Sequence, residues 1–270
     1  MQRIAYFLCY SNIWIALGAA SSALMYSVCF QKSINWSLLL FLFSSTLLAY
    51  TFQRFEKLRK KEGISGPRMD WMIRSSKTVK GIMVVGLLST VVSVFFLSVE
   101  SWLLLPVTAL ISFFYAFKIK GINLRDIPFV KIILIGAVWA LSAGWMFFIE
   151  DQDFSRLGVQ YSFFMFLYII AITIPFDIRD IHLDETGKKT IPQLFGIKGA
   201  KVIAVTLTII AFLLLESMTV LNMWFHLLAI SISVLAILYA HPKRHELYFS
   251  FGVDGLLIVI PVLAYLLNIL

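Results

Sequence analysis

Long apolar segments separated by short polar ones dominate the chain. A helix needs about 20 apolar residues to cross a bilayer, and several runs reach that length while the fourth and eighth are shorter. The pattern predicts an all-α protein with nine membrane-spanning helices. The expected spans are residues 4–27, 34–53, 79–98, 101–117, 127–149, 158–176, 199–218, 223–240 and 247–269.

The composition supports a polytopic membrane protein. Of the 270 residues, 60% are hydrophobic and only 14% are charged. A soluble domain of this size places far more charge on its surface. We therefore expect one transmembrane domain, residues 1–270, and no separate soluble domain.

The positive charges fall on one side of this predicted topology. With the N-terminus inside, 21 of the 23 Lys and Arg residues lie in inside segments, and only Lys32 and Arg156 lie outside. The positive-inside rule then predicts the N-terminus inside and the C-terminus outside. The net charge of +8 follows from this distribution, and no nucleic-acid motif accompanies it. We expect membrane lipids as partners, not nucleic acid.

Three aspartates follow the apolar run that ends at Ile174. Asp177, Asp180 and Asp184 are spaced i, i+3 and i+7. On a helix they fall within an arc of roughly 60°, with Arg179 on the far side. Carboxylates clustered at the end of a membrane helix repel one another and are costly to desolvate. Mg²⁺ removes that cost, and it binds one or two carboxylates together with phosphate oxygens.

Basic residues extend this stretch and the other inside loops. Lys188 and Lys189 come directly after the aspartates and are suited to hold a polyanion. The stretch therefore predicts a Mg²⁺–diphosphate site at a membrane surface. Donors at the helix ends also suit a diphosphate, whose charge grows as its C–O bond breaks. The alternatives are a solvated acidic loop with a basic end and, for single Lys or Arg residues, topology signals or anchors.

The stretch from Asp177 to Gly196 resembles the second aspartate-rich motif of the UbiA superfamily of intramembrane prenyltransferases. That motif reads Asp-x-x-Asp-x-x-x-Asp, then Gly-Lys/Arg-x-Thr-x-Pro and a Gly. The segment Tyr115…Lys118 resembles, more loosely, a Tyr- and Lys-containing stretch after the family's fourth helix. Asp254 and the Gly after it resemble an Asp-Gly pair in the last span.

The resemblance implies nine helices around a central cavity, with the active site on the cytoplasmic side. It implies Mg²⁺ bridging an isoprenyl diphosphate to catalytic aspartates. The resulting allylic cation alkylates a lipophilic acceptor, expected to be aromatic or a quinone precursor. We expect the bacterial inner membrane as the location. The resemblance implies metal binding and catalysis by Asp177, Asp180 and Asp184. As diphosphate donors we expect the basic residues of the inside loops and helix ends, and as acceptor contacts Tyr115 and Asp254. The expected diphosphate donors are Arg54, Lys57, Lys118, Arg179, Lys188 and Lys189.

The chain departs from the family's first motif, Asn-Asp-x-x-Asp-x-x-x-Asp. At the end of the second span it has no aspartate. Glu56 is the only carboxylate nearby, and Thr51 or Gln53 stands at the Asn position. We predict that two Mg²⁺ sites are reduced to one, and that Arg54 and Lys57 contact the diphosphate directly. The alternative is that the chain binds prenyl diphosphates poorly.

Asp254 lies about two turns into the last span. An intramembrane carboxylate faces the bundle interior or a partner. It is expected either to orient the acceptor or accept its proton, or to form a structural pair with a Lys such as Lys131.

Two other functions stay open from the sequence. One is a terpene cyclase of the same architecture, which needs no acceptor. The other is a transporter or lipid-binding protein, a class in which internal repeats are common. Mg²⁺-dependent diphosphate release separates the enzymes from the transporter, and acceptor dependence separates the two enzymes.

Overall fold

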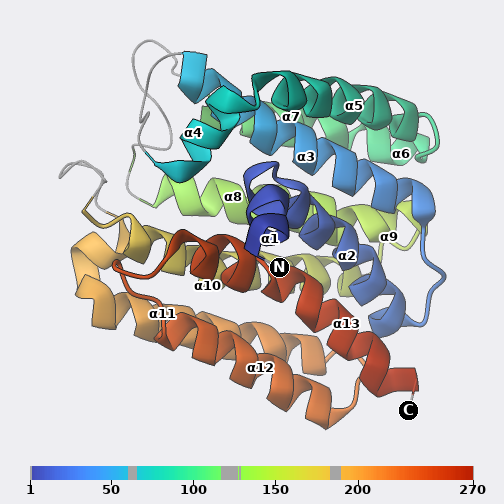
Figure 1. Cartoon of the computed structure of the whole chain (residues 1–270). Coiled ribbons are helices and arrows are strands. Elements are labelled where there is room, and N and C mark those ends of the chain that lie inside the picture. The colour runs from blue at the N-terminus through green and yellow to red at the C-terminus, as the bar shows by residue number, and fades with distance from the viewer. Residues whose placement is uncertain (1, 60–65, 117–126, 128, 183–189, 270) are drawn as a thin grey trace.

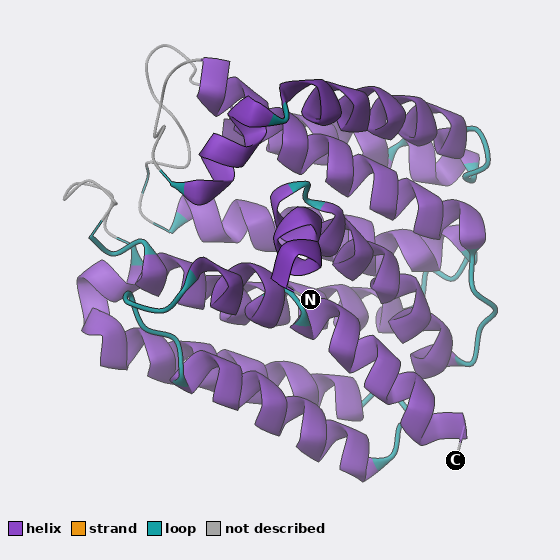
Figure 2. Cartoon of the chain, viewed as in Figure 1, coloured by secondary structure: helices purple, strands orange, loops and turns teal. Residues whose placement is uncertain are grey.

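The chain folds into a helical bundle. A computed structural model describes residues 2–59, 66–116, 127, 129–182 and 190–269. All regular elements among these residues are helical (Figure 2), as the hydropathy pattern predicts. In chain order they are α1 (Gln2–Tyr10), α2 (Ile13–Phe30), α3 (Trp36–Arg59), α4 (Pro67–Arg74), α5 (Ser76–Val94), α6 (Val99–Trp102), α7 (Leu104–Ala116), α8 (Val130–Ala140), the π-helix η2 (Leu141–Trp145), α9 (Met146–Glu150), α10 (Arg156–Arg179), α11 (Ile191–Glu216), α12 (Met223–Leu238), the π-helix η3 (Tyr248–Val253) and α13 (Leu256–Ile269).

Within the described residues, seven helical segments are long and apolar enough to cross a membrane. Two shorter apolar helices, Val99–Phe113 and Met223–Leu238, fall where the fourth and eighth spans are predicted. The number of spans and the orientation of the chain stay predictions. The seven long segments are Ile13–Phe30, Trp36–Arg59, Ser76–Val94, Val130–Glu150, Arg156–Arg179, Ile191–Glu216 and Tyr248–Asn268.

The expectation of one continuous first helix over residues 4–27 is wrong. The chain turns between α1 and α2, where Asn12 adopts the left-handed conformation (φ 64°, ψ 8°). Asparagine tolerates this conformation better than most residues. The Asn12 side-chain amide also donates a hydrogen bond of 3.1 Å to Thr51 Oγ1 on α3. The separate helix α1 therefore packs near α4 and η3.

Helix α10 lies at the centre of the bundle. It packs against α8, η2 and α11, and α3 packs against α2 and α5 (Figure 1). Its tightest approach is at Gly158, where an added Cβ would come within 2.5 Å of the Trp145 ring. Small residues at such crossings let membrane helices pack closely. Large buried aromatic side chains fill the space around α10, among them Tyr161, Phe148 and Phe164.

The ends of α3 and α10 and the starts of α8 and α11 lie together at one end of the bundle (Figure 1). We call this the basic end, because Arg54, Lys57, Lys131 and Arg179 lie there. The stretch expected to be a long loop after α3 contributes the short helix α4 to it.

Glu150 organises the opposite end of the bundle. It accepts hydrogen bonds from the Ser98 backbone N–H (2.9 Å), the Ser98 hydroxyl (3.0 Å) and the Ser101 hydroxyl. Asn35, just before α3, adds a longer contact of 3.4 Å. The carboxylate thereby ties α9 to α6 and to the start of α3.

We predict that Glu150→Ala lowers the free energy of unfolding by about 1–3 kcal/mol, because it leaves several donors without their charged acceptor. Thermal melting in mild detergent measures the effect. Glu100→Ala is the matched control, since Glu100 is an exposed carboxylate on α6, the short helix that Glu150 contacts. Equal melting temperatures for the two variants would show that the Glu150 contacts do not stabilise the bundle.

Candidate functional site

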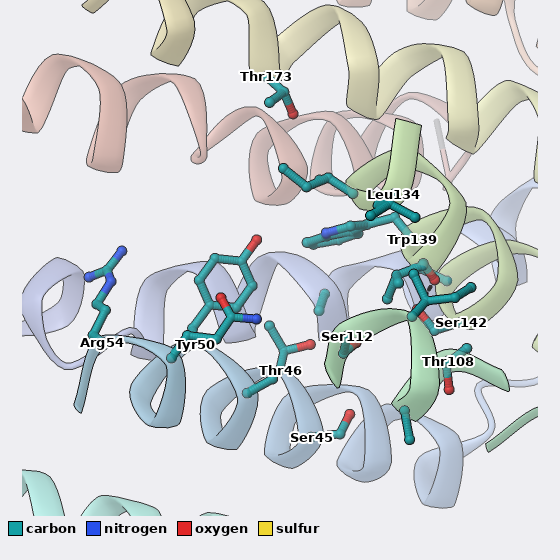
Figure 3. Close-up of a pocket in the computed structure, with 18 of the residues that line it drawn as sticks. Ser45, Thr46, Tyr50, Arg54, Thr108, Ser112, Leu134, Trp139, Ser142 and Thr173 are labelled. Atoms are coloured by element: carbon teal, nitrogen blue, oxygen red, sulfur yellow. Dashed lines mark hydrogen bonds between the residues drawn. The ribbon is translucent and has the colours of Figure 1, made fainter. Parts of the chain in front are cut away.

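A cavity of about 620 Å³ lies inside the bundle at its basic end. Its walls come from α3, α5, α7, α8, η2 and α10, with Asp254 reaching it from the segment after η3. Figure 3 shows Arg54 at one end of the cavity lining, and Thr108 and Ser142 toward the other end. The cavity thus has a charged end and a deeper, less polar end.

Cations outnumber carboxylates at the charged end. Among the described residues, two carboxylates line the cavity, Asp180 and Asp254. The cations that line it are Arg54, Lys57, Arg68, Lys131 and Arg179.

Arg54 and Lys57 lie in the last two turns of α3, and Arg179 is the last residue of α10. The end of a helix carries partial negative charge, so cations are favoured there. Arg54 Nη1 is buried and has no hydrogen-bond partner among the described residues. A buried guanidinium nitrogen in this state is suited to an anionic ligand.

Arg68 is a cavity residue that the sequence did not single out. It lies in the first turn of α4, where Arg68 Nε is 3.0 Å from Glu246 Oε1 and the guanidinium lies 5.3 Å from the centre of the Tyr10 ring. Burial lowers the pKa of Arg68, while the charges of Glu246 and Asp254 act in the opposite direction. The Gly-Pro before it indicates a helix start, but not that the helix faces a cavity.

Asp177 is held by a lysine and does not line the cavity. It is buried, with 3% of its surface exposed, and Lys131 Nζ donates a hydrogen bond of 2.6 Å to its Oδ1. This ion pair joins α8 to α10. The alternative that Lys131 pairs with Asp254 is therefore wrong, because the Asp177 carboxylate takes that lysine.

Asp180 lies just beyond the end of α10 and faces the cavity. Arg179 donates two hydrogen bonds to its carboxylate, from Nε to Oδ1 at 2.7 Å and from Nη2 to Oδ2 at 2.8 Å. The expectation that Arg179 points away from the aspartates is wrong. It assumed that the helix continues past Asp180, but α10 ends at Arg179, so the neighbouring side chains can meet.

A π-helical turn places Asp254 at the cavity. Its backbone N–H donates to the Phe249 carbonyl (3.0 Å), which is five residues back. Such wide turns are frequent at functional sites. The positive charges of Arg68, Arg54 and Arg179 attract the negative Asp254 carboxylate.

Several predicted site residues lie outside the described part of the chain. These are Lys118, Asp184, Lys188 and Lys189, and for Tyr115 the backbone of α7 is described but not the side chain.

The two candidates for the Asn position of the first motif have different surroundings at the end of α3. Gln53 lines the cavity, while Thr51 is buried and accepts from Asn12. Glu56 does not line the cavity and pairs with Arg59 at 2.8 Å.

The described residues fit one magnesium ion better than two. No group of three or more His, Cys, Asp or Glu side chains gathers among them. Asp180 alone presents a carboxylate to the cavity at the end of α10. Mg²⁺ is commonly held by one or two carboxylates plus phosphate oxygens of a substrate, so Asp180 together with a diphosphate is a suitable donor set.

Hydroxyl groups line the deeper end of the cavity. Thr90, Ser142 and Thr173 each donate a 2.7 Å hydrogen bond to a backbone carbonyl one turn earlier. Their protons are used, so they offer only lone pairs to a ligand. Along α8 and η2, Ser142 lies roughly 15 Å from Lys131, the cation at the start of α8. The lining hydroxyl residues are Ser45, Thr46, Thr90, Thr108, Ser112, Ser142 and Thr173.

The fold and the cavity define an all-helical membrane protein with a basic-ended internal site. The profile of the UbiA prenyltransferase family matches residues 73–248, and the chain belongs to that family. It is thus an integral membrane protein, as the resemblance implies. The matched range includes Asp177 and Asp180 but begins after Arg54, Lys57 and Arg68. No curated protein sequence matches the chain significantly.

Solved structures of UbiA homologues share the fold. A homologue from Archaeoglobus fulgidus bound to GPP and Mg²⁺ matches with a TM-score of 0.64 and 11% identity, over 98% of this chain and 100% of that one. The same homologue bound to DMAPP and Mg²⁺ gives 0.61 and 11%, over 97% and 98%. The apo homologue from Aeropyrum pernix K1 gives 0.62 and 14%, over 97% of each chain.

We predict that Lys131→Met destabilises the protein by about 3–5 kcal/mol, because it leaves the Asp177 charge buried without a partner. The double variant Lys131→Met, Asp177→Leu should recover most of this loss. Thermal melting in detergent measures both, with the exposed Lys80 changed to Met as the control. A double variant no more stable than the single one would show that the ion pair is not what makes Lys131 necessary.

Proposed function

We propose that this protein transfers an isoprenyl group from a prenyl diphosphate to a lipophilic acceptor within the membrane, with Mg²⁺ as cofactor. The observation that carries the proposal is the cavity, which joins an excess of cations at one end to a less polar volume inside the bundle. An amphiphile with an anionic head fits that division. Membership of the family and the prenyl diphosphates bound by the Archaeoglobus homologue support the same reaction class.

The diphosphate is proposed to lie among Arg54, Lys57, Arg68 and Arg179. Guanidinium groups match phosphate oxygens in pairs, and lysine supplies a point charge. Lys118, Lys188 and Lys189 are proposed to add donors from the loops around this end. These cations stabilise the negative charge that grows on the leaving diphosphate.

Asp180 is the proposed principal Mg²⁺ ligand, with Asp177 and Asp184 as further ligands. For Asp177 this requires Lys131 to give up its hydrogen bond. When bound, the ion neutralises charge on the leaving diphosphate.

In the proposed reaction, the bond between C1 of the isoprenyl group and the diphosphate oxygen breaks, and its electron pair leaves with the diphosphate. The electron-rich carbon of the acceptor forms a new bond to C1. The acceptor then loses a proton. Asp180 and Asp254 both line the cavity, and we propose Asp254 as the proton acceptor because Asp180 is assigned to the metal. Trp139 and Tyr50, which also line the cavity, present aromatic faces that favour a passing cation.

The hydroxyl lining bears on the acceptor. Four of the lining hydroxyls, those of Thr90, Thr108, Ser142 and Thr173, donate to backbone carbonyls and so offer lone pairs to a ligand. Such groups favour a ligand with O–H donors, and an isoprenoid chain has none. We propose a phenol or quinol as the acceptor, consistent with an aromatic quinone precursor. Tyr115 stays a proposed contact of this acceptor.

The basic end is proposed to face the cytoplasm, since positive charge marks the inner side of membrane proteins. The bacterial inner membrane is the proposed location.

The first test is pyrophosphate release by the purified protein with Mg²⁺, a geranyl, farnesyl or geranylgeranyl diphosphate and a panel of phenols and quinols. We predict that Asp180→Asn lowers kcat/KM by about 10²-fold or more, because a carboxylate that binds the metal is lost. Asp70→Asn, on the exposed face of α4, is the control and should match the wild type.

The outcomes separate the candidate functions. Release that needs both Mg²⁺ and an acceptor supports the transferase. Release without an acceptor supports a terpene cyclase, and donor binding without release under any condition supports a lipid-binding or transport protein.

We predict that Thr108→Val lowers kcat/KM for a phenolic acceptor by about 2- to 10-fold, the effect of one lost hydrogen bond, and leaves the KM of the donor unchanged. The methyl ether of the acceptor should lose the same factor with the wild type but not with the variant. Thr78→Val, at an exposed position on α5, is the control. Equal discrimination by wild type and Thr108→Val would exclude Thr108 as an acceptor contact.

A further inference from the structure

We infer that the protein binds the diphosphate of its donor without a divalent cation, through the cationic side chains of the basic end alone. The inference rests on the proposed function and concerns how that site holds its ligand. It limits Mg²⁺ to the bond-breaking step.

The charge at the cavity carries the first part of the inference. Among the described residues, five cations and two carboxylates line the cavity. Asp177 and Glu246, outside the lining, pair with two of these cations, Lys131 and Arg68. The charged groups and their partners still leave a positive excess, which favours an anionic head group. A cavity of this sign attracts the anion directly, whereas a site built of carboxylates repels it unless a metal lies between them.

The pairing of the carboxylates carries the second part. Both oxygens of Asp180 face the guanidinium of Arg179, at 2.7 and 2.8 Å. Asp177 is taken by Lys131. A divalent cation must displace a protein cation to reach either of these two carboxylates. A diphosphate can instead contact Arg54, whose Nη1 has no hydrogen-bond partner among the described residues. In the unliganded site an anion therefore meets an available donor, while these two carboxylates are already paired.

Arg54 carries the third part. Its Nη1 is buried and has no hydrogen-bond partner in the part of the chain that the structure describes, and a buried charged donor in this state is costly. It stands at the end of α3, in the stretch where the family resemblance leads one to expect the first acidic motif. A guanidinium there binds phosphate oxygens without an intermediary, and Arg68 brings a second from α4.

The inference predicts that Mg²⁺ affects turnover but not affinity for the donor. Affinity for the donor is set by covalently attached cations and does not change with Mg²⁺. Turnover does change with Mg²⁺, because the leaving diphosphate gains charge only as the bond breaks.

The test uses the full chain in mild detergent and geranyl S-thiolodiphosphate, a donor analogue that resists ionisation. Binding is measured by isothermal titration in excess EDTA and again with Mg²⁺. We expect the two dissociation constants to agree within about threefold. Binding that weakens more than tenfold in EDTA would overturn the inference but leave the proposed function standing. No binding in either buffer would overturn the proposed function itself.

Variants of α3 locate the effect. Arg54→Gln should weaken binding in EDTA by roughly 10- to 100-fold, as expected for a lost charge-assisted hydrogen bond, and should make binding sensitive to Mg²⁺. Arg54→Lys should retain most of the metal-free affinity. Arg59→Gln is the matched control, since Arg59 is exposed on the same helix and does not line the cavity.

Thermal melting of each variant checks that it is folded. A folded Arg54→Gln variant with wild-type affinity in EDTA would show that Arg54 is not the ligand of the diphosphate.

Discussion

The repulsion among like charges at the end of an apolar bundle is the constraint that shapes this protein. Each cation there must have a counter-ion, a helix end or a ligand, because a bare charge in this environment is costly. The counter-ions come from distant parts of the chain. Lys131 meets Asp177 and so joins α8 to α10, and Arg68 meets Glu246 and so brings α4 against the segment before η3. The same ion pairs that relieve the repulsion therefore hold together the helices at the basic end of the cavity.

The two ends of the bundle use polar contacts differently. At the far end the Glu150 carboxylate accepts hydrogen bonds from the neutral donors of Ser98, and these bonds hold neighbouring helix ends together. At the basic end most polar groups are charged, and Arg54 Nη1 has no hydrogen-bond partner among the described residues. The first arrangement is satisfied by the protein's own groups, whereas the second leaves a buried donor for the proposed ligand.

The sequence predicts the helical class, most helix positions and the family, because these depend on apolar run length and on one dense motif. It misses the break at Asn12, since a single left-handed residue leaves the hydropathy of the segment unchanged. It misplaces Arg179, because the helical phase was extended past the residue where α10 ends. It also passes over Arg68, and it offers Lys131 as one possible partner of Asp254, whereas Lys131 pairs with Asp177. Those pairings depend on how separate helices pack, and no local pattern encodes that.

The position of Arg54 and Lys57 in the last turns of α3 has a consequence for the stability of the bundle. The C-terminal end of a helix favours cations and disfavours carboxylates by about 0.3–1 kcal/mol each. The helix itself thus offsets part of the cost of placing these two cations at the end of an apolar bundle. A carboxylate at either position would lose this contribution and meet a helix end of its own sign.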